Sequence, residues 1–269
     1  MSDLSGKVAV LTGGGGILCS AMASAVAERG ATVAVLDLNL AAAQKVTDGI
    51  TSAGGKAIAA EADVLSRESL EKAAQTIHDR CGPVDILVNG AGGNKAEATA
   101  GGEMSFFDIP ADAIQWVFNL NCLGTILASQ VFVRDMVEKK EGVVVNIASM
   151  CGIRPLTRVV SYSAAKAAIA NFTQWLAVHL AQEYSPKIRV NAMAPGFFLT
   201  AQNEYLLIDQ DTKKPSPRGE TILDLTPSGR YGVPEDLLGT LLWLVGDESA
   251  FVSGTIIPVD GGFAAFSGV

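Results

Sequence analysis

The sequence predicts an α/β fold built on a doubly wound, parallel, seven-stranded sheet with helices on both faces. Two observations predict it: short, nearly continuous apolar runs recur along the chain, and amphipathic stretches of helical periodicity separate them. The apolar runs predict strands at residues 7–11, 32–36, 56–60, 84–89, 143–148, 188–193 and 255–259. The stretches between them predict helices at residues 17–29, 39–53, 66–80, 111–139, 161–184 and 234–247.

The length and composition indicate a single domain over residues 1–269. Hydrophobic residues make up 49% of the chain and charged residues 18%, which is enough apolar material for a substantial core. No change of composition and no proline- or glycine-rich linker divides the sequence. Residues 197–231 form an irregular stretch with several prolines and glycines, and we expect this stretch to be a substrate lid.

The charge balance points to a small-molecule partner. The chain has 20 basic and 28 acidic residues, a net charge of −8, which argues against nucleic acid or an anionic membrane as a partner. The four cysteines show no C-x-x-C spacing and only two histidines accompany them, so we expect reduced thiols and no metal site. With no signal peptide and no apolar run of membrane-spanning length, we expect a cytoplasmic protein.

A glycine run follows the first predicted strand, at Gly13 to Gly16, and directly precedes the first helix. Glycines at this point allow a tight turn and let backbone N–H groups approach a pyrophosphate. Asp37 ends the second strand, where a carboxylate can accept hydrogen bonds from both ribose hydroxyls of an adenosine and repel a 2′-phosphate. The pattern favours NAD over NADP. The alternative reading of Asp37 is a solvated turn residue that caps the next helix.

Two further strand ends carry residues that suit a dinucleotide. Asp63 and Val64 follow the third strand and could contact the adenine ring, whereas Asn89, Ala91 and Gly92 follow the fourth, where small residues leave room. Each feature alone could be ordinary turn chemistry. Because the carboxyl ends of parallel strands meet at one edge of the sheet, their recurrence at successive strands predicts a cofactor cleft.

A second group of residues suits proton transfer. Tyr162 and Lys166 lie four residues apart on a predicted helix and therefore share a face. Ser149 ends the fifth strand, 13 residues before Tyr162, and Asn121 lies in the preceding helical region. Each is a common residue; the combination with the upstream glycine turn is what indicates chemistry.

These motifs together resemble the short-chain dehydrogenase/reductase family over essentially the whole chain. The matching elements are T-G-G-G-G at 12–16, N-G-A-G at 89–92, N-x-x-G at 121–124, Ser149, Y-S-A-A-K at 162–166 and P-G at 195–196. The resemblance implies a Rossmann fold and an NAD-dependent oxidoreductase. It makes Tyr162 the general acid/base, with a pKa lowered by the Lys166 ammonium and by the nicotinamide's positive charge. Lys166 would also hold the nicotinamide ribose, Ser149 would bind the reacting carbonyl, and Asn121 would hold a relay water.

The same resemblance implies the remaining cofactor contacts and the assembly. The contacts are expected at Gly13, Gly16, Ile17, Leu18, Pro195, Gly196 and Thr200, besides Tyr162 and Lys166. The family's turn reads T-G-x-x-x-G-x-G, but Ile17 and Cys19 stand where the later two glycines would be. The loop is therefore either re-set around Gly14 to Gly16, or the pyrophosphate lies slightly differently. Family likeness also suggests a homotetramer built on helices 111–139 and 161–184, with the apolar tail 262–269 packed at an interface.

Several segments more specifically resemble the D-mannonate oxidoreductase, or fructuronate reductase, branch of the family. They are T-G-G-G-G-I-L-C, N-G-A-G-G-N-K-A-E-A-T, N-F-T-Q-W-L-A-V-H, A-P-G-F-F-L-T and D-G-G-F-A-A-F-S-G-V. This likeness implies interconversion of D-fructuronate and D-mannonate with NAD(H). A sugar-acid substrate needs a cationic or amide partner, for which the candidates are Asn94, Lys95, Arg154 and Arg158. The alternative is that Arg154 and Arg158 are surface or subunit-contact residues.

Two other functions remain open at this point. The first is an NAD-dependent dehydrogenase of another sugar, polyol or gluconate-like acid. The second, of a different class, is a non-catalytic nucleotide-binding sensor, which could keep the glycine turn and Asp37 while losing the catalytic residues. The presence of all four residues, Asn121, Ser149, Tyr162 and Lys166, favours an enzyme.

Overall fold

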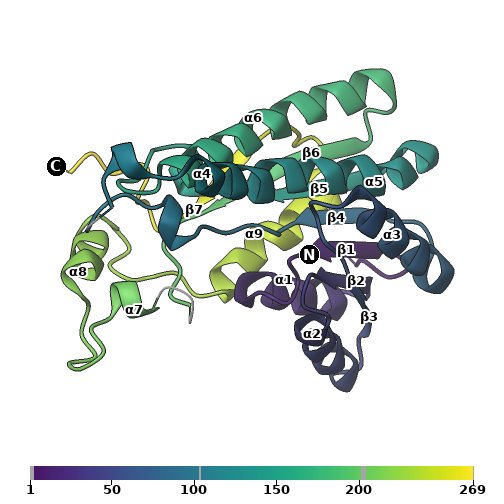
Figure 1. The fold of residues 1–269 in the computed structure, drawn as a ribbon. Coiled ribbons are helices and arrows are strands. Elements are labelled where there is room, and N and C mark those ends of the chain that lie inside the picture. Colours follow the sequence, from purple (N-terminus) through teal and green to yellow (C-terminus); the bar gives the residue numbers. More distant parts are fainter. Residues whose placement is uncertain (1–2, 103, 201–203, 269) are drawn as a thin grey trace.

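The computed structural model describes residues 3–102, 104–200 and 204–268, and its seven named strands form one parallel sheet. The fold class expected from the sequence is confirmed (Figure 1). The strand order is β3 (Lys56–Glu61), β2 (Thr32–Asp37), β1 (Val8–Thr12), β4 (Ile86–Asn89), β5 (Gly142–Ile147), β6 (Ile188–Pro195) and β7 (Ile256–Val259). Because β1 pairs with both β2 and β4, the winding direction reverses beside β1, which is where such sheets bind their ligands.

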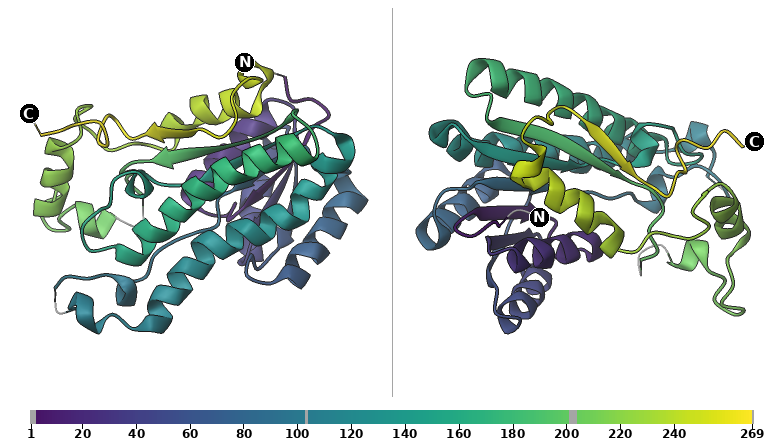
Figure 2. Two further views of the ribbon diagram at one scale, coloured as in Figure 1. Left: turned by 90° about the horizontal axis from the view of Figure 1, so that it is seen from above. Right: turned by 180° about the vertical axis from the view of Figure 1, so that it is seen from behind.

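Helices cover both faces of the sheet. The described helices are α1 (Ile17–Glu28), α2 (Leu40–Ser52), α3 (Arg67–Cys81), α4 (Ala111–Phe118), α5 (Gly124–Lys139), α6 (Val160–Glu183), α7 (Glu204–Leu207), α8 (Pro217–Asp224) and α9 (Glu235–Val245). One buried cluster joins α1, α2 and α9 to the sheet, and a second joins α3, α5 and α6 to the opposite face. Figures 1 and 2 show these two helical layers on either side of the strands.

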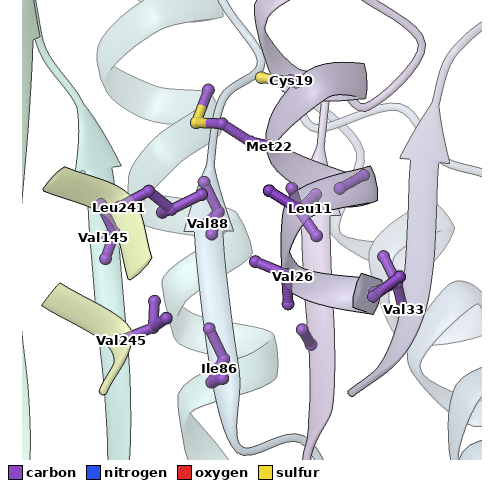
Figure 3. Close-up of a cluster of buried hydrophobic side chains, with 14 of the residues drawn as sticks. Leu11, Cys19, Met22, Val26, Val33, Ile86, Val88, Val145, Leu241 and Val245 are labelled. Carbon is purple, nitrogen blue, oxygen red and sulfur yellow. The ribbon is translucent and has the colours of Figure 1, made fainter. Parts of the chain in front are cut away.

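Alternation along β1 explains how one strand serves both clusters. Leu11 belongs to one buried cluster with Met22 and Val26 of α1 and Leu241 of α9, which Figure 3 shows, whereas Val10 belongs to the cluster on the other face. Successive side chains of a strand point to opposite faces, so a strand between two helical layers must be apolar at every position. This requirement produces the continuous apolar runs seen in the sequence.

The long helical region expected at residues 111–139 is interrupted. A π-helical turn, Asn119–Leu123, separates α4 from α5. The whole stretch has a mean hydropathy of 1.4 over its most apolar window, so among the described residues one helix has the length and composition of a membrane span. This differs from the expectation that no such segment exists. Because 56% of that window is buried within the fold, the stretch behaves as a core helix.

The stretch 197–231 contains two short helices, α7 and α8, within its described parts. Figures 1 and 2 place both helices at one end of the molecule, near the C-terminal tail. Isolated bridges tie the stretch together, Phe198 to Gly232 and Ile208 to Pro215. Its role as a substrate lid stays a prediction.

A buried chain of hydrogen bonds ties the centre of the sheet to the helices of one face. The Asn89 amide donates to Asn146 Oδ1 at 2.8 Å and to Ser129 Oγ at 3.0 Å, and Asn146 Nδ2 donates to Thr173 Oγ1 at 2.9 Å. These residues come from β4, β5, α5 and α6. A buried polar group that loses its partner costs about 1–3 kcal/mol.

We therefore expect Asn146→Ala to lower the free energy of unfolding by about 2 kcal/mol or more, because it leaves both Asn89 and Thr173 short of a partner. Urea denaturation followed by circular dichroism measures the loss. The matched control is Gln75→Ala, which removes an exposed 2.8 Å hydrogen bond to Asp79 and should cost less than about 0.5 kcal/mol. Equal losses in the two variants would contradict a structural role for the buried chain.

Candidate active site

The glycine turn after β1 has no space for side chains. Gly13 adopts a φ of +63°, and a Cβ there would lie 2.7 Å from the Ala91 backbone. A Cβ at Gly14 would meet Val35 at 2.7 Å, and one at Gly15 would meet the Asp37 carboxylate at 3.0 Å. Glycine is therefore required because neighbouring strand ends approach the turn closely.

Helix α1 begins directly after this turn and offers uncapped donors. Gly16 is the N-cap residue and provides no side-chain hydrogen bond to the helix. The first N–H groups of a helix lack intrahelical partners and carry a partial positive charge, so this helix start can bind an anion. Ile17 and Leu18, both expected cofactor contacts, are the first two residues of α1.

The structure explains how the turn accommodates Ile17 and Cys19. Ile17 has a 38% exposed side chain and so avoids the crowded turn. Cys19 is buried, and its Sγ lies 2.2 Å from the position that a Cβ of Gly90 would take. The larger residue at position 19 is thus matched by a glycine on the neighbouring strand end. Burial raises the pKa of the Cys19 thiol to about 12, so this thiol stays protonated.

Asp37 lies at the end of β2 with its carboxylate turned toward the glycine turn. Its Oδ2 accepts from Gly15 N at 3.0 Å and its Oδ1 from Asn39 N at 2.9 Å. The alternative reading, a cap for the next helix, falls to another residue, because Asn39 is the N-cap of α2 and its Oδ1 accepts from Ala42 N at 3.2 Å. The position of Asp37 fits a ribose carried on the adjacent pyrophosphate.

Some of the other predicted cofactor residues have side chains that are already engaged within the protein. Asp63 holds its own turn, since its Oδ1 accepts from Leu65 N at 2.9 Å, and Val64 is buried against Gly124. Asn89 is 2% exposed and uses its amide donors in the buried chain described above, so its side chain serves the core. The remaining predicted cofactor residues lie at or after the ends of two strands. They are Ala91 and Gly92 after β4, and Pro195, Gly196 and Thr200 at the end of β6 and beyond.

The π-helical turn places Asn121 beside the loop after β4. Its Oδ1 accepts from Gly93 N at 3.1 Å, and its Nδ2 donates to Gly93 O at 2.7 Å and to Val117 O at 2.8 Å. Asn121 is fully buried. Single π turns inside α-helices occur often at functional sites, and here the turn frees the Val117 carbonyl to accept from the Asn121 side chain.

Lys166 comes from α6 and reaches the same place. It is 3% exposed, and its Nζ donates to Ile147 O at 2.7 Å. A Cβ at Gly92 would lie 2.6 Å from Asn121 Oδ1 and 3.2 Å from Lys166 Nζ, so Gly92 packs between these two side chains. Burial lowers the pKa of Lys166 to about 8.

Tyr162 and Ser149 complete the cluster. Lys166 Nζ lies 5.5 Å from the centre of the Tyr162 ring, and a hydrogen bond with Ser149 favours the ionised tyrosine. Burial is nevertheless the largest effect and raises the pKa of Tyr162 above its ordinary value, with a smaller rise from Cys151. In the protein alone the desolvation of the phenol therefore outweighs the polar contacts, and the lowered pKa expected with the nicotinamide's positive charge nearby stays a prediction.

The four candidate substrate residues are not equivalent. Asn94 Nδ2 donates to Thr99 Oγ1 at 2.9 Å, Lys95 Nζ lies 5.3 Å from the centre of the Trp116 ring, and Arg154 Nη1 donates to Phe266 O at 2.9 Å. These contacts already occupy three of the polar groups. The Arg158 guanidinium makes no hydrogen bond or ion pair to any described residue.

Sequence reasoning missed two residues of this site. Gly93 bonds the Asn121 side chain through both its N–H and its carbonyl, and Cys151 N donates to Ser149 Oγ while the Cys151 thiol raises the pKa of Tyr162. Their positions, next to the N-G-A-G motif and two residues after Ser149, were the available signals. Among the described residues, no three metal-binding side chains gather.

Comparison with known proteins identifies the family. The short chain dehydrogenase family matches residues 7–211. The chain belongs to this family. It is therefore an oxidoreductase of the short-chain dehydrogenase/reductase type, as the motifs indicated.

Several relatives of this short-chain dehydrogenase match over nearly its whole length. It is 50% identical to the uncharacterized oxidoreductase UxuB of Bacillus subtilis (strain 168), covering 99% of this chain and 98% of the relative. An uncharacterized oxidoreductase of Haemophilus influenzae is 46% identical, with 99% and 96% covered. A crystal structure with bound NAD, provisionally named a D-mannonate oxidoreductase from Haemophilus influenza, is 46% identical with a TM-score of 0.94, covering 100% of this chain and 98% of that one.

The two glycines after Ala91 provide a matched test of the cluster. We expect Gly92→Ala to lower kcat about 10- to 100-fold, because the new methyl group displaces Asn121 or Lys166. Gly93→Ala adds the same methyl group where nothing lies within 4 Å, and should leave kcat nearly unchanged. Steady-state assays of both variants measure the difference. Equal activities would show that the close packing around Gly92 is not needed for catalysis.

Proposed function

We propose that this short-chain dehydrogenase interconverts D-fructuronate and D-mannonate with NAD(H). The observation that carries the proposal is the gathering of Lys166, Asn121 and Gly92 beside Tyr162 and Ser149, next to a glycine turn suited to a dinucleotide. The substrate rests on the similarity to the NAD-bound structure provisionally named a D-mannonate oxidoreductase and on the sequence segments quoted above. The alternative is an NAD-dependent dehydrogenase of another sugar, polyol or gluconate-like acid.

The residues present fit NAD. The uncapped start of α1, at Ile17 and Leu18, would hold the pyrophosphate, and the Asp37 carboxylate would hold the adenosine ribose and oppose a 2′-phosphate. Gly13 and Gly16 would let the pyrophosphate approach, and Lys166 would bind the nicotinamide ribose. Bound NAD supplies the hydride chemistry.

Each catalytic side chain has a distinct task in ketone reduction. The Tyr162 hydroxyl gives its proton to the substrate oxygen, and because burial keeps the phenol neutral, this proton is present at neutral pH. The Ser149 hydroxyl donates a hydrogen bond to the same oxygen and stabilises the charge that develops there. Lys166 and a water held by Asn121 return a proton to Tyr162. In the alcohol-oxidising direction the same groups carry the proton outward.

The proposed assembly is a homotetramer built on α4 to α6, with residues 197–231 as the substrate lid. Apolar side chains on α6 support an interface, because Trp175 is 56% exposed and Val178 is 57% exposed in the single chain. A second copy of this chain would cover them.

The first test follows NADH consumption with D-fructuronate, D-tagaturonate, 5-ketogluconate and fructose, repeated with NADPH. We expect turnover selective for D-fructuronate and NADH. Tyr162→Phe should remove turnover and keep NADH binding, measured by fluorescence titration, because only the proton donor is lost. Activity on another ketose with no turnover of D-fructuronate would overturn the substrate, and unchanged turnover in Tyr162→Phe would overturn the acid/base role.

The lowered pKa of Lys166 predicts an alkaline limb in the activity profile. The ammonium form is lost as the pH rises through about 8, so kcat/KM for NADH in ketone reduction should fall above that pH. Lys166→Arg keeps its positive charge at all accessible pH values. In this variant the fall in kcat/KM should therefore move to higher pH, and the maximum kcat/KM should be lower. Rates measured from pH 6 to pH 10 test this, and a limb at the same pH in both proteins would assign it to another group.

A further inference from the structure

The chain folds into a compact turn directly after β7, at residues 260–266, which we call the C-terminal turn. Gly261 and Gly262 have φ values of +64° and +90°, a backbone conformation that other residues rarely adopt. The Asp260 carboxylate closes the turn, because its Oδ1 accepts from Gly262 N at 2.9 Å and its Oδ2 accepts from Ala264 N at 2.8 Å. The shape of this turn is therefore set by its own sequence.

The C-terminal turn contacts the loop after β6 at the P-G motif. A Cβ at Gly196 would lie 2.6 Å from Asp260 Cβ, so the two backbones touch here. The next residue of the loop, Phe197, packs edge to face on Phe263, with the ring centres 5.1 Å apart. Because Gly196 is a predicted cofactor contact, the turn lies directly against the part of the loop that is expected to meet the dinucleotide.

The C-terminal turn also holds the end of the expected substrate lid. Gly261 O accepts two hydrogen bonds from Ser228, from its N at 3.1 Å and from its Oγ at 3.0 Å. A Cβ at Gly261 would lie 2.9 Å from Thr226 Cγ2, and one at Gly262 would lie 3.2 Å from Pro227 Cγ. Figure 2 shows the tail running past the end of the molecule that carries α7 and α8. The last part of the stretch 197–231 therefore packs on the turn.

A third contact joins the C-terminal turn to the loop after β5. Arg154 Nη1 donates to Phe266 O at 2.9 Å, although the two residues are 112 positions apart. Arg154 comes five residues after Ser149, in the loop that leads to Tyr162. A hydrogen bond from a guanidinium is stronger than one between neutral groups. The turn thus connects three segments that border the catalytic cluster.

The loop that Arg154 belongs to forms one wall of a cavity beside this cluster. The cavity has a volume of 460 Å³, and the wall from this loop consists of Cys151, Gly152, Pro155, Leu156 and Arg158. Ser163, the residue after Tyr162 on α6, lines the same cavity. The position of the loop therefore sets the shape of a space next to the catalytic residues.

We propose that the C-terminal turn is a clasp that holds the loop after β5 and the end of the lid in the arrangement that binds substrate, and that Arg154 is the positioning residue that closes it. This inference rests on the proposed function, because that function makes residues 197–231 the substrate lid. Arg154 then acts through the turn and not on the substrate carboxylate, and the tail packs on its own chain.

The clasp acts on substrate binding by ordering the site beforehand. A loop that is ordered only when substrate arrives lowers the affinity by the free energy of that ordering, and a loop already held does not. The Tyr162 hydroxyl and the cofactor turn lie outside the three contacts. Opening the clasp should therefore raise KM for the ketone and leave kcat and the binding of NADH nearly unchanged.

Steady-state kinetics of Arg154 variants test the positioning role. We expect Arg154→Gln to raise KM for D-fructuronate about 3- to 10-fold, as for the loss of one hydrogen bond, with kcat within about twofold of the native value. Arg154→Lys keeps a charged donor and should recover part of the loss. The matched control is Arg67→Gln, which also removes one exposed arginine hydrogen bond, to Glu71 at 2.8 Å, and should leave KM unchanged.

A shortened chain separates the clasp from direct binding of the substrate carboxylate. A chain that ends at Ala264 loses the Phe266 carbonyl and should show the same rise in KM as Arg154→Gln. Arg154 then has no partner to hold, so Arg154→Gln in the shortened chain should raise KM by less than about twofold more. If Arg154 binds the carboxylate itself, the two losses multiply, and that result would overturn the proposal.

Limited proteolysis gives a readout that needs no substrate. Trypsin can cleave the lid after Lys213, Arg218 or Arg230. We expect cleavage of the lid about 3- to 10-fold faster in Arg154→Gln and in the shortened chain than in the native protein, because the open form is more populated. Arg67→Gln should be cleaved at the native rate. Equal rates in all four proteins would contradict the clasp.

Two further outcomes are distinguished by the same experiments. The shortened chain should keep the native oligomeric state in size-exclusion chromatography, and a smaller assembly would assign the tail to a subunit interface and overturn the clasp. If the native protein turns over another ketose and not D-fructuronate, the proposed substrate falls. The clasp is then decided by the lid cleavage and by KM for that ketose, so its failure and the failure of the proposed function give different results.

Discussion

The contact between the carboxyl ends of β1 and β4 is the constraint on which the site depends. Thr12, the last residue of β1, accepts hydrogen bonds through its hydroxyl oxygen from Gly90 N at 3.2 Å and from Ala91 N at 3.3 Å. This joins the glycine turn to the loop after β4 at the point where the winding of the sheet reverses. The absence of side chains at Gly13 and Gly90 permits the approach, and Cys19 fills the remaining space. The cofactor turn and the loop carrying Gly92 are thereby held in one arrangement.

From this contact the catalytic cluster is assembled by burial. Gly93 binds the Asn121 side chain through both its N–H and its carbonyl, and Lys166 is held by the Ile147 carbonyl. A buried lysine with a single described hydrogen bond is costly in free energy, and the lowered pKa of Lys166 reflects that cost. The fold tolerates it because the sheet and α6 fix the surrounding backbone. An ammonium that can lose its proton near pH 8 suits a proton relay better than an exposed lysine would.

Interactions that lower the stability of the free protein often occur at binding sites, since a ligand then supplies the missing partner. Buried Arg189 behaves differently, because it donates to Ser249 Oγ and to the Gly246 carbonyl and so fastens the segment after α9 to β6.

The sequence alone determined the sheet, the helices and the family, because these follow from local information. Apolar periodicity is a property of neighbouring residues, and the glycine turn, Asp37, Ser149, Tyr162 and Lys166 are recognised by their spacing along the chain. Only the tertiary structure decided which polar groups are already engaged. Asn89 serves the core, Arg154 binds the Phe266 carbonyl, and Asn121 is fixed by the backbone of Gly93. Each of these depends on contacts between residues far apart in sequence, and neither propensity nor spacing encodes such contacts.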